Sequence, residues 1–226
     1  MSNLISFSGG KDSTAMVLKM LENNEDITDI IYVDTEMEFP EMYEHINKFE
    51  QYIERKITRL KFSTPFEDLM IHREVKRGKH AGQIGYGWPR PNARFCTTYK
   101  TQALNKYIRN KYKNIEYSEC VGIAYDEKKR IRDKRYPLVE YKMTEKDCLE
   151  YCYSHGFDWN GLYTKFNRLS CFLCPLQSLK ELEVVYNDFP KLWNYMRYLD
   201  THCVNSFRID YTLDVLEKRF NNEQVL

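Results

Sequence analysis

Hydrophobic positions follow two different spacings along the first half of the chain. Short apolar runs at residues 4–7 and 30–33 are typical of strands that are buried on both faces of a sheet. Between these runs, the apolar residues of 14–21 recur close to the helical period. The pattern predicts strands at residues 4–7, 30–33, 57–62 and 116–124, and helices at residues 14–21, 40–56, 66–75 and 97–111.

The alternation of strands and helices indicates the fold class. Helices of this length between consecutive strands favour βαβ units, and therefore an α/β, Rossmann-like fold with a parallel sheet flanked by helices. Residues 78–92 contain four glycines and two prolines and predict an irregular loop. We expect an α/β domain over residues 1–143 and a helical C-terminal extension over residues 144–226, which carries a Cys-x-x-Cys pair and packs on the same core.

Composition narrows the class of protein. The 226 residues are 42% hydrophobic and 30% charged, as in folded globular proteins. No apolar run approaches the roughly 20 residues that cross a membrane, and the N-terminus shows no signal-like segment. We therefore expect a cytoplasmic protein without a membrane partner, in which the seven cysteines serve as thiols or metal ligands rather than as disulfides.

A net charge of +1 conceals a basic region. Residues 73–113 contain eleven lysines and arginines against a single acid, and a second basic run covers residues 128–135. A solvated face is the simple explanation for the lysines, whereas arginines close to aromatic residues favour contact with phosphate or a nucleotide. On the helix predicted at residues 40–56, His45 lies among acids, and we expect it to be solvated.

The stretch SFSGGKDST joins the first predicted strand to the first predicted helix. A glycine-rich turn at this point gathers backbone N–H groups next to the positive end of a helix dipole, and so predicts an anion site. The alternative is an ordinary capped turn, because serine and aspartate favour helix starts. In an anion site, Lys11 would add charge, and Asp12 would orient the loop or hold magnesium. The candidate binding residues are Ser6, Ser8, Gly9, Gly10, Lys11, Asp12, Ser13 and Thr14.

Residues 8–13, SGGKDS, resemble the S-G-G-x-D-S signature of the PP-loop ATP pyrophosphatases, and in particular of the phosphoadenosine phosphosulfate (PAPS) reductase-like family. Further segments resemble that family's motifs in the same order: Asp34–Thr35 with EFPEMYEHI, then ARFCTTYKTQAL, GIAYDEKKR, RYPLVEY and LYTKFNRLSCFLCP. The resemblance implies an adenine nucleotide α-hydrolase-like parallel sheet. The Arg-x-Cys-Thr form at residues 94–97 is most similar to the family's nucleic-acid sulfurtransferases.

The resemblance also implies a reaction. ATP would bind with its β- and γ-phosphates on the loop and its adenosine beside Asp34 and Thr35. With Mg²⁺ present, an acceptor oxygen would attack the α-phosphorus and release pyrophosphate, and sulfur would then displace AMP. The expected acceptor is a nucleic acid or a small molecule, and the expected sulfur donor is an external protein such as a cysteine desulfurase. The resemblance adds Gly122 and Arg94 as binding residues, and Lys11, Asp12, Lys100 and Arg130 as catalytic residues.

Three cysteines are candidate metal ligands. Cys171 and Cys174, followed by proline, form a tight chelating pair, and the resemblance places Cys96 in the same site. Three thiolates on a 4Fe–4S cluster would leave one iron open to a sulfur atom. Zinc is the competing interpretation, with Cys120, a histidine or water as the fourth ligand. Arg94 and neighbouring lysines are expected to lower the pKa of these thiols.

Two further cysteines and two alternative functions complete the expectations from the sequence. Cys148 and Cys152 are expected to be small core residues. A sulfonucleotide reductase is the second candidate function, disfavoured because no cysteine follows Cys203 to act as its terminal nucleophile. A non-catalytic nucleotide-binding module of a larger assembly is the third. The oligomeric state is left open, with a homodimer among the expectations.

Overall fold

The computed structural model describes residues 2–222, and packing divides them into two compact units. The sheet unit contains residues 2–34, 39–61 and 102–169, and the helical unit contains residues 35–38, 62–101 and 170–222. Every helix within the described residues is too short or too polar to span a bilayer. Because this division follows packing in space, it differs from the sequence-based boundary at residue 143, which stays a prediction.

A four-stranded parallel sheet forms the centre of the sheet unit, in agreement with the predicted fold class. Its strands are β1 (Ser2–Phe7), β2 (Ile27–Asp34), β3 (Thr58–Lys61) and β4 (Tyr117–Val121). Their order is β3-β2-β1-β4, and each neighbouring pair is parallel. Strands β2 and β3 are therefore added on one side of β1, and β4 is added on the other side of β1. Ligands of open parallel sheets bind at such a switch point, beyond the carboxyl ends of the strands.

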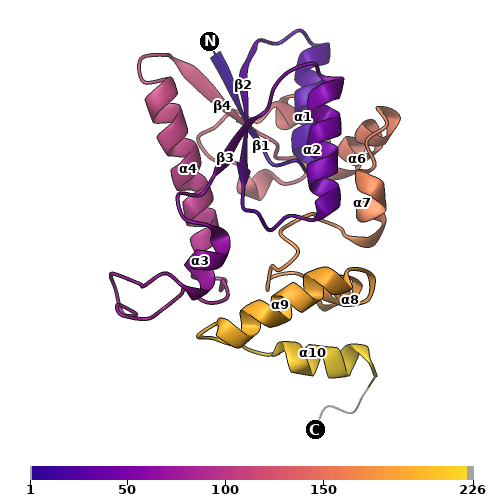
Figure 1. The fold of residues 1–226 in the computed structure, drawn as a ribbon. Helices are drawn as coiled ribbons and strands as arrows, with labels where there is room; N and C mark the ends of the chain where they lie inside the picture. The colour runs from indigo at the N-terminus through magenta and orange to yellow at the C-terminus, as the bar shows by residue number, and fades with distance from the viewer. Residues whose placement is uncertain (1, 223–226) are drawn as a thin grey trace. The chain divides into compact units, whose positions relative to one another are not determined.

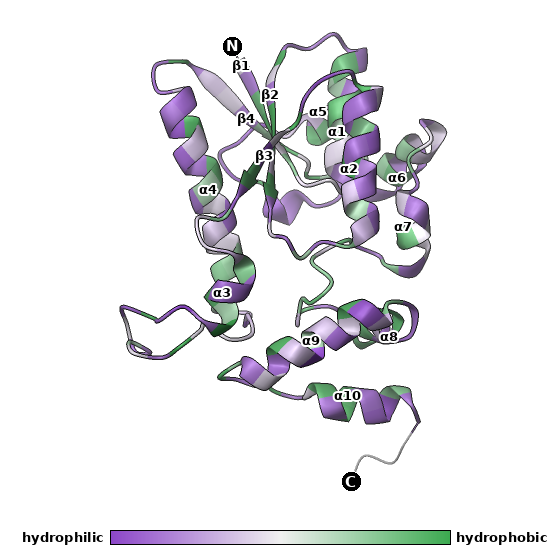
Figure 2. Ribbon diagram, viewed as in Figure 1, coloured by the Kyte–Doolittle hydropathy of each residue, from purple (hydrophilic) through white to green (hydrophobic). Residues whose placement is uncertain are grey.

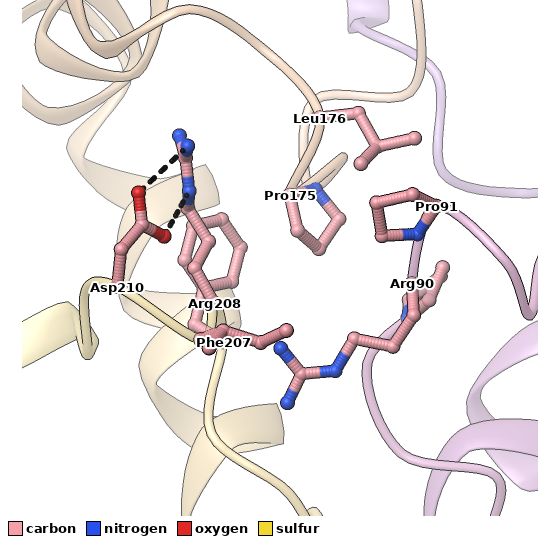
Figure 3. A pocket seen from close by; sticks show the side chains of 9 residues that line it. Arg90, Pro91, Pro175, Leu176, Phe207, Arg208 and Asp210 are labelled. Atoms are coloured by element: carbon pink, nitrogen blue, oxygen red, sulfur yellow. Dashed lines mark hydrogen bonds and ion pairs between the residues drawn. The ribbon is translucent and has the colours of Figure 1, made fainter.

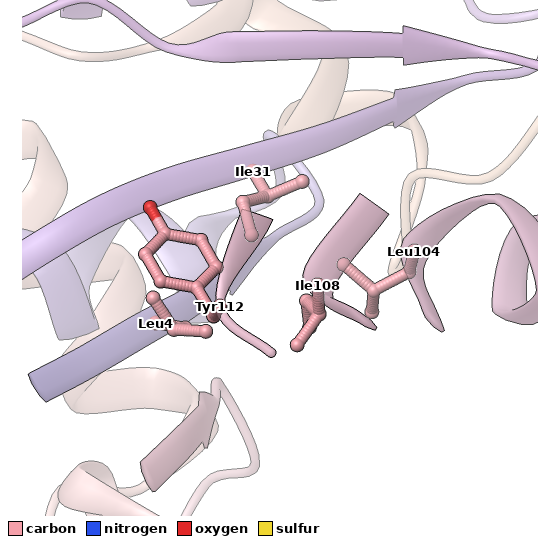
Figure 4. Packing of buried hydrophobic residues seen from close by; sticks show 5 residues of the cluster. All are labelled: Leu4, Ile31, Leu104, Ile108 and Tyr112. Carbon is pink, nitrogen blue, oxygen red and sulfur yellow. The ribbon is translucent and has the colours of Figure 1, made fainter. Parts of the chain in front are cut away.

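Helix α4 (Phe95–Lys111) packs on one face of this sheet through its part from residue 102 onward. Figure 4 shows strand and helix side chains meeting in one apolar cluster. The cluster consists of Leu4, Ile31, Leu104, Ile108 and Tyr112, each at most 8% exposed. Full burial of a leucine or isoleucine side chain contributes about 1.5–3 kcal/mol, so this contact fixes α4 firmly on the sheet.

Helices α1 (Lys11–Glu22) and α2 (Pro40–Tyr52) cover the opposite face (Figure 1). The rings of Phe7 in β1 and Phe49 in α2 stack with centroids 5.3 Å apart. Figure 2 shows hydrophobic residues concentrated in the sheet and polar residues on α2. With both faces covered, the strands carry the continuous apolar runs that the sequence displays.

The sheet unit is completed by short helices that follow β4. They are the 3₁₀ helix η1 (Lys128–Arg130), α5 (Pro137–Glu140), α6 (Glu145–Ser154), the 3₁₀ helix η2 (Trp159–Gly161) and α7 (Leu162–Lys165). A capping box starts α6, because the Thr144 hydroxyl accepts from the Asp147 amide while the Asp147 carboxylate accepts from the Thr144 amide. Cys148 and Cys152 of α6 are fully buried, as predicted for core residues.

The helical unit contains α3 (Phe66–Ile71), α8 (Leu179–Asp188), α9 (Pro190–His202) and α10 (Leu213–Phe220), besides the first residues of α4. The helix predicted at residues 66–75 ends at Ile71, because the Val75 amide turns to bond the carbonyl of Gln83 at 2.8 Å. The predicted loop at residues 78–92 contains only isolated bridges, and its Trp88 is buried and donates to Asp200 at 2.7 Å.

Candidate functional site

The loop between β1 and α1 presents unpaired amides at a helix start. Gly9 adopts a φ of +79°, which glycine allows without strain, and Gly10 is the N-cap of α1 without a side-chain cap. Among the described residues, the backbone N–H groups of Gly9, Asp12 and Ser13 have no hydrogen-bond partner. Because helix N-termini concentrate such donors beside the positive end of the dipole, this turn fits an anion.

The hydroxyl groups of the loop hold its shape. Ser8 Oγ and Ser13 Oγ lie 3.0 Å apart, and the Ser8 amide donates to Ser13 Oγ at 3.2 Å. Ser13 Oγ also lies 3.0 Å from the Gly10 carbonyl oxygen. The predicted serines are thus brought together. Ser6, predicted with them, lies within β1, paired with Ile31 and Val121 on the neighbouring strands.

A wall of aromatic side chains from η2 and α7 supports the loop from behind. Trp159 Nε1 donates to the Gly9 carbonyl at 2.8 Å, and the Lys11 amide donates to Tyr163 Oη at 2.8 Å. The two rings meet edge to face, with centroids 4.8 Å apart. Residues beyond 143 therefore shape the loop. The sequence motif did not indicate these two residues, since their contact depends on the fold.

His45 is buried against the same loop, so the prediction of a solvated His45 was wrong. It is 4% exposed, its ring stacks on Trp159 at 4.3 Å, and its Nε2 lies 3.0 Å from Thr14 Oγ1. Burial, with a smaller contribution from Lys48, lowers the pKa of His45 to about 3. Glu41 and Glu44 of α2 line one pocket together with His45, yet the His45 ring itself is buried, and its neutral imidazole contacts the Thr14 hydroxyl.

Gly122 brings the end of β4 into contact with the loop. A Cβ on this residue would lie 2.8 Å from the backbone nitrogen of Ser13 and 2.9 Å from its Cα. Only glycine allows so close an approach of two backbones. The predicted residue Gly122 is therefore part of the site, at the switch point between β1 and β4.

Three carboxylates meet beside the loop. The ligand atoms of Asp12, Glu127 and Glu145 lie within 4.8 Å of one another, the one such group of three or more His, Cys, Asp or Glu among residues 2–222. Lys11 Nζ lies 2.7 Å from Asp12 and 3.2 Å from Glu145. Carboxylate oxygens at this spacing suit a divalent cation such as Mg²⁺. Sequence reasoning missed both glutamates, although Glu127 lies inside the segment GIAYDEKKR that it singled out.

The ionisation of this group reflects its burial. Burial raises the pKa of Asp12, the charge of Lys11 opposes this, and Glu145 and Glu127 add to it. For Lys11, burial alone would lower the pKa, but its ion pairs with Asp12 and Glu145 raise it above the usual value. Lys11 therefore stays protonated, while burial opposes the ionised form of Asp12, which a bound cation would favour.

A chamber of about 730 Å³ lies next to these acids, within the sheet unit. Tyr125, Glu127, Lys128 and Arg130 contribute to its lining, and Lys128 Nζ lies over the Tyr125 ring at 4.3 Å from its centroid. Arg130 Nη1 lies 2.6 and 2.8 Å from the two oxygens of Glu127. This volume suits a nucleotide-sized ligand, and the predicted Arg130 reaches the acid group through Glu127.

The helical unit holds a separate cluster of three cysteines. Cys96 lies in the first turn of α4, and Cys171 and Cys174 lie in the turn before α8, where the Cys174 amide bonds the Cys171 carbonyl at 3.1 Å. The charges of the three thiols act on one another: Cys96 raises the pKa of both others. The predicted set Cys96, Cys171 and Cys174 is therefore brought together, and we name it the cysteine cluster.

Burial controls the thiols of this cluster. It raises the pKa of Cys171 and of Cys174, and the opposing charges of Lys100 and Arg94 do not offset it. Lys100 lowers the pKa of Cys171 and Arg94 lowers the pKa of Cys174, as expected, but desolvation of the thiolates outweighs both contributions. A bound metal would favour the thiolate form of Cys171 and Cys174 against this burial.

The chemistry of these residues fits a metal centre. Three thiols gathered with two cations form a donor set for iron or zinc. Because the three sulfurs do not form a group within 4.8 Å among the described residues, at least one pair of them lies farther apart than that. The donor set itself suits an iron cluster or a zinc ion.

Two side chains complete the surroundings of Cys171. Glu38 Oε1 lies 3.3 Å from Lys100 Nζ and 4.0 Å from Cys171 Sγ. Burial alone would lower the pKa of Lys100, but Glu38 and the thiols Cys171 and Cys96 raise it. The predicted catalytic Lys100 therefore belongs to the cysteine cluster. Sequence reasoning did not single out Glu38.

Cys120 lies in the other unit, within β4. It is fully buried opposite Ile5, and its thiol lies 3.7 Å from Asn3 Oδ1. Burial raises the pKa of Cys120 to about 11. These surroundings favour a packing role, and its assignment as a fourth metal ligand stays a prediction.

The two predicted adenosine-binding residues have different partners. Asp34 Oδ1 accepts from the Tyr43 hydroxyl at 2.9 Å. Thr35 is 1% exposed, and its hydroxyl lies 3.1 Å from Glu38 Oε1 and 3.8 Å from Cys171 Sγ. Thr35 thus contributes to the cysteine cluster, and adenosine binding by either residue stays a prediction. Arg94 is exposed, and its charge acts on Cys174.

A pocket of about 110 Å³ adjoins the cluster where the chain continues past Cys174. Figure 3 shows Pro91, Pro175 and Leu176 close together, and Arg208 paired with Asp210. The adjacent Ile209 is 87% exposed. Apolar rings beside guanidinium groups form a surface that a planar or anionic ligand could contact.

Comparison with known proteins now adds to this geometry. Residues 2–177 match the phosphoadenosine phosphosulfate reductase domain. The uncharacterized protein MJ0066 of Methanocaldococcus jannaschii is 30% identical over 205 residues, covering 84% of this chain and 39% of that protein. MJ0973 of the same organism is 26% identical over 203 residues, covering 84% and 45%. The nin region protein ORF290 of Escherichia phage lambda is 26% identical over 208 residues, covering 83% and 70%.

The chain thus spans less than half the length of the two archaeal relatives. Among solved structures, it is similar to the U34-tRNA thiolase NcsA from Methanococcus maripaludis with its [4Fe-4S] cluster, with a TM-score of 0.45 and 15% identity. That similarity covers 89% of this chain and 72% of the thiolase chain.

Proposed function

Because the chain belongs to the phosphoadenosine phosphosulfate reductase domain family, we propose that it is a PP-loop enzyme that cleaves ATP to AMP and pyrophosphate, adenylylating an acceptor for sulfur transfer. One observation carries the proposal: the unpaired amides of Gly9, Asp12 and Ser13 at the start of α1. They suit the β- and γ-phosphates, which leave together when the bond to the α-phosphate breaks.

The acids beside the loop would supply the metal part of this reaction. Asp12, Glu127 and Glu145 would hold Mg²⁺ against the triphosphate, and the ion would stabilise the negative charge that develops on the leaving pyrophosphate. Lys11 would stay protonated and exchange part of its pairing from the acids to a phosphate. An acceptor oxygen would attack the α-phosphorus, and its proton would pass to solvent or to one of these carboxylates.

The cysteine cluster would supply the sulfur chemistry. Cys96, Cys171 and Cys174 would hold a 4Fe–4S cluster, which provides an iron open to a sulfur atom; zinc is the alternative occupant. Lys100 would hold positive charge beside the thiolates. The sulfur would come from an external donor such as a cysteine desulfurase, and its attack on the adenylylated acceptor would release AMP.

The chamber after β4 is our candidate site for the acceptor. Tyr125 offers a ring on which a base can stack, and Lys128 and Arg130 offer charge for a phosphate. These properties favour a nucleic-acid acceptor over an uncharged small molecule.

Incubation of anaerobically prepared protein with α-labelled ATP, Mg²⁺ and RNA or DNA tests the proposal. We expect labelled AMP or adenylylated nucleic acid together with pyrophosphate. Release of ADP and phosphate, or no cleavage with any acceptor, would contradict it.

The family's name keeps a sulfonucleotide reductase as the second candidate. Release of sulfite from PAPS in the presence of reduced thioredoxin would support that candidate against ATP cleavage. Binding of ATP without any product would instead favour a nucleotide-binding module.

A further inference from the structure

Glu38 is a buried carboxylate without an assigned role, in contact with the cysteine cluster. It is 8% exposed, and its Oε1 lies close to Cys171 Sγ, to Lys100 Nζ and to the Thr35 hydroxyl, at 4.0, 3.3 and 3.1 Å. Among the described residues, no hydrogen bond reaches its second oxygen, Oε2. A buried carboxylate that uses one oxygen only has an acceptor atom to spare.

The backbone around Glu38 holds it in register with the cysteine turn. Glu36 adopts a φ of +65°, a conformation that costs a non-glycine residue about 1–2 kcal/mol. The next carbonyl, that of Met37, accepts from the Phe172 amide at 3.1 Å, directly after Cys171. This backbone hydrogen bond joins the segment that carries Glu38 to the turn that carries Cys171.

An ion pair with Lys100 alone does not account for this arrangement. The Lys100 side chain is 40% exposed and could pair with an acid at the surface, whereas the Glu38 side chain is 6% exposed. Burying a carboxylate for one partly exposed lysine gives little net stability. A carboxylate oxygen next to a cysteine thiol is, in contrast, one of the donor groups that metal ions accept in proteins.

We propose that Glu38 supplies a fourth protein ligand, through a carboxylate oxygen, to the metal centre held by Cys96, Cys171 and Cys174. The inference rests on the metal centre of the proposed function and names the group that closes its open position. An oxygen ligand binds soft iron less tightly than a thiolate, so sulfide can displace it. The exchange involves no electrons: Glu38 leaves as a carboxylate and pairs with the Lys100 ammonium group.

Anaerobic reconstitution with ferrous iron and sulfide tests the proposal on three proteins: wild type, Glu38→Gln and Glu67→Gln. Glu67 is the matched control, a half-buried carboxylate of the same unit that bonds Tyr195 and Tyr198. We expect Glu38→Gln to lose iron to a chelator about 10- to 100-fold faster than wild type. After mild oxidation it should give the electron paramagnetic resonance signal of a three-iron cluster, while Glu67→Gln behaves as wild type.

A second variant separates ligation from a structural role. Glu38→Cys replaces the oxygen donor with sulfur, and we expect it to retain iron at least as well as wild type, which a residue needed only for packing or charge would not allow. Circular dichroism confirms that each variant is folded. Equal iron loss in wild type and Glu38→Gln, or a Glu38→Cys protein that loses iron like Glu38→Gln, would overturn the proposal.

The outcome is independent of ATP cleavage. If wild type binds iron in the manner described but releases no pyrophosphate from ATP, the proposed reaction fails and the Glu38 ligand stands. If wild type cleaves ATP but binds neither iron nor zinc at the cysteines, the Glu38 ligand fails and the adenylylation proposal stands.

Discussion

The loop after β1 and the cysteine cluster differ in how far each is prepared for its ligand. The loop is fixed by hydrogen bonds to Trp159 and Tyr163, and its unpaired amides can accept an anion without any change in their own ionisation. In the cysteine cluster, burial raises the pKa of Cys171 and Cys174, so the thiols must lose protons before they can bind a metal.

The difference teaches what each ligand must contribute. An anion supplies the negative charge, so the protein needs only to hold the backbone N–H donors in position before the anion binds. A metal brings the charge that stabilises thiolates, so the protein can leave its ligands protonated until the metal arrives. Substitutions at the first site should therefore act through shape, and substitutions at the second through loss of the bound metal.

The largest effect is expected at the cysteine cluster. Cys171→Ser should lose nearly all bound iron or zinc, because two remaining thiols chelate weakly. Metal content per chain, measured after anaerobic purification, checks this. Cys120→Ala is the matched control, expected to keep its metal and to lose only about 1 kcal/mol of stability; loss of metal from it would instead support Cys120 as a ligand.

The next effect concerns the shape of the loop. In Gly122→Ala, the new Cβ would lie 2.8 Å from the Ser13 nitrogen, so the start of α1 must shift. We expect pyrophosphate release to fall at least about 100-fold, since small misplacements of binding groups cost this much.

Gly156→Ala is the control for Gly122→Ala. Gly156 has a φ of +79°, but its new Cβ would meet no atom within 4 Å. It should lose about 1–2 kcal/mol of stability and keep its activity. Similar activity of the two variants would argue against the contact between β4 and the loop.

Substitution of Asp12 should lower enzymatic activity without lowering the stability of the fold. Asp12→Asn is expected to reduce pyrophosphate release about 10- to 100-fold through loss of one magnesium ligand. Because the pKa of Asp12 is raised in the folded state, its ionised form destabilises the fold; the neutral asparagine should make the protein equally or more stable at pH 7.

The pH dependence gives the sign of this effect. Protonation of Asp12 stabilises the folded protein, because the Asp12 pKa is higher in the folded than in the unfolded state. This stabilisation is complete below the unfolded pKa, near 3.8, and is lost as the pH rises through the folded pKa. The advantage of Asp12→Asn should therefore shrink as the pH falls toward 4, as measured by urea unfolding. A variant that is less stable than wild type at pH 7 would indicate that the Lys11 ion pair dominates.

The smallest effect is expected for His45. The pKa of His45 is about 3 in the folded protein, against 6.5 for an ordinary histidine in the unfolded chain. Between these two pH values the unfolded chain binds more protons than the folded protein, so the free energy of unfolding falls as the pH drops through this range. At pH 5 the loss relative to pH 7 should reach about 2 kcal/mol. His45→Gln should remove this pH dependence, while replacement of the exposed His72 by Gln should leave it intact.

The sequence predicted the parts of the molecule that are local. Apolar runs located the strands, and the glycines and serines of residues 8–13 located the turn with unpaired amides before α1, because a strand, a turn and a helix start are determined by neighbouring residues. The burial of His45 and the meeting of Asp12 with Glu127 and Glu145 were not predictable in this way. They depend on which helices pack behind the loop, and the side chains involved are common on solvated surfaces.

The cysteine cluster lies between these cases. The Cys-x-x-Cys pair was visible from its spacing, and Cys96 from a resemblance to a family, whereas Glu38 begins the quoted segment EFPEMYEHI but was not singled out within it. The contribution of the cations to the thiol pKa values was predictable because charge can be counted in a sequence, and the larger effect of burial was not.

The contact between Gly122 and Ser13 has a consequence for observing this protein in solution. The Ser13 nitrogen lies beside the end of β4, and its N–H group is one of the unpaired donors at the start of α1. A single nuclear resonance, that of this backbone nitrogen, should therefore respond both to phosphate in the turn and to occupants of the chamber that begins just past Gly122. Titration with each separately would show whether nucleotide and acceptor are sensed by the same atom.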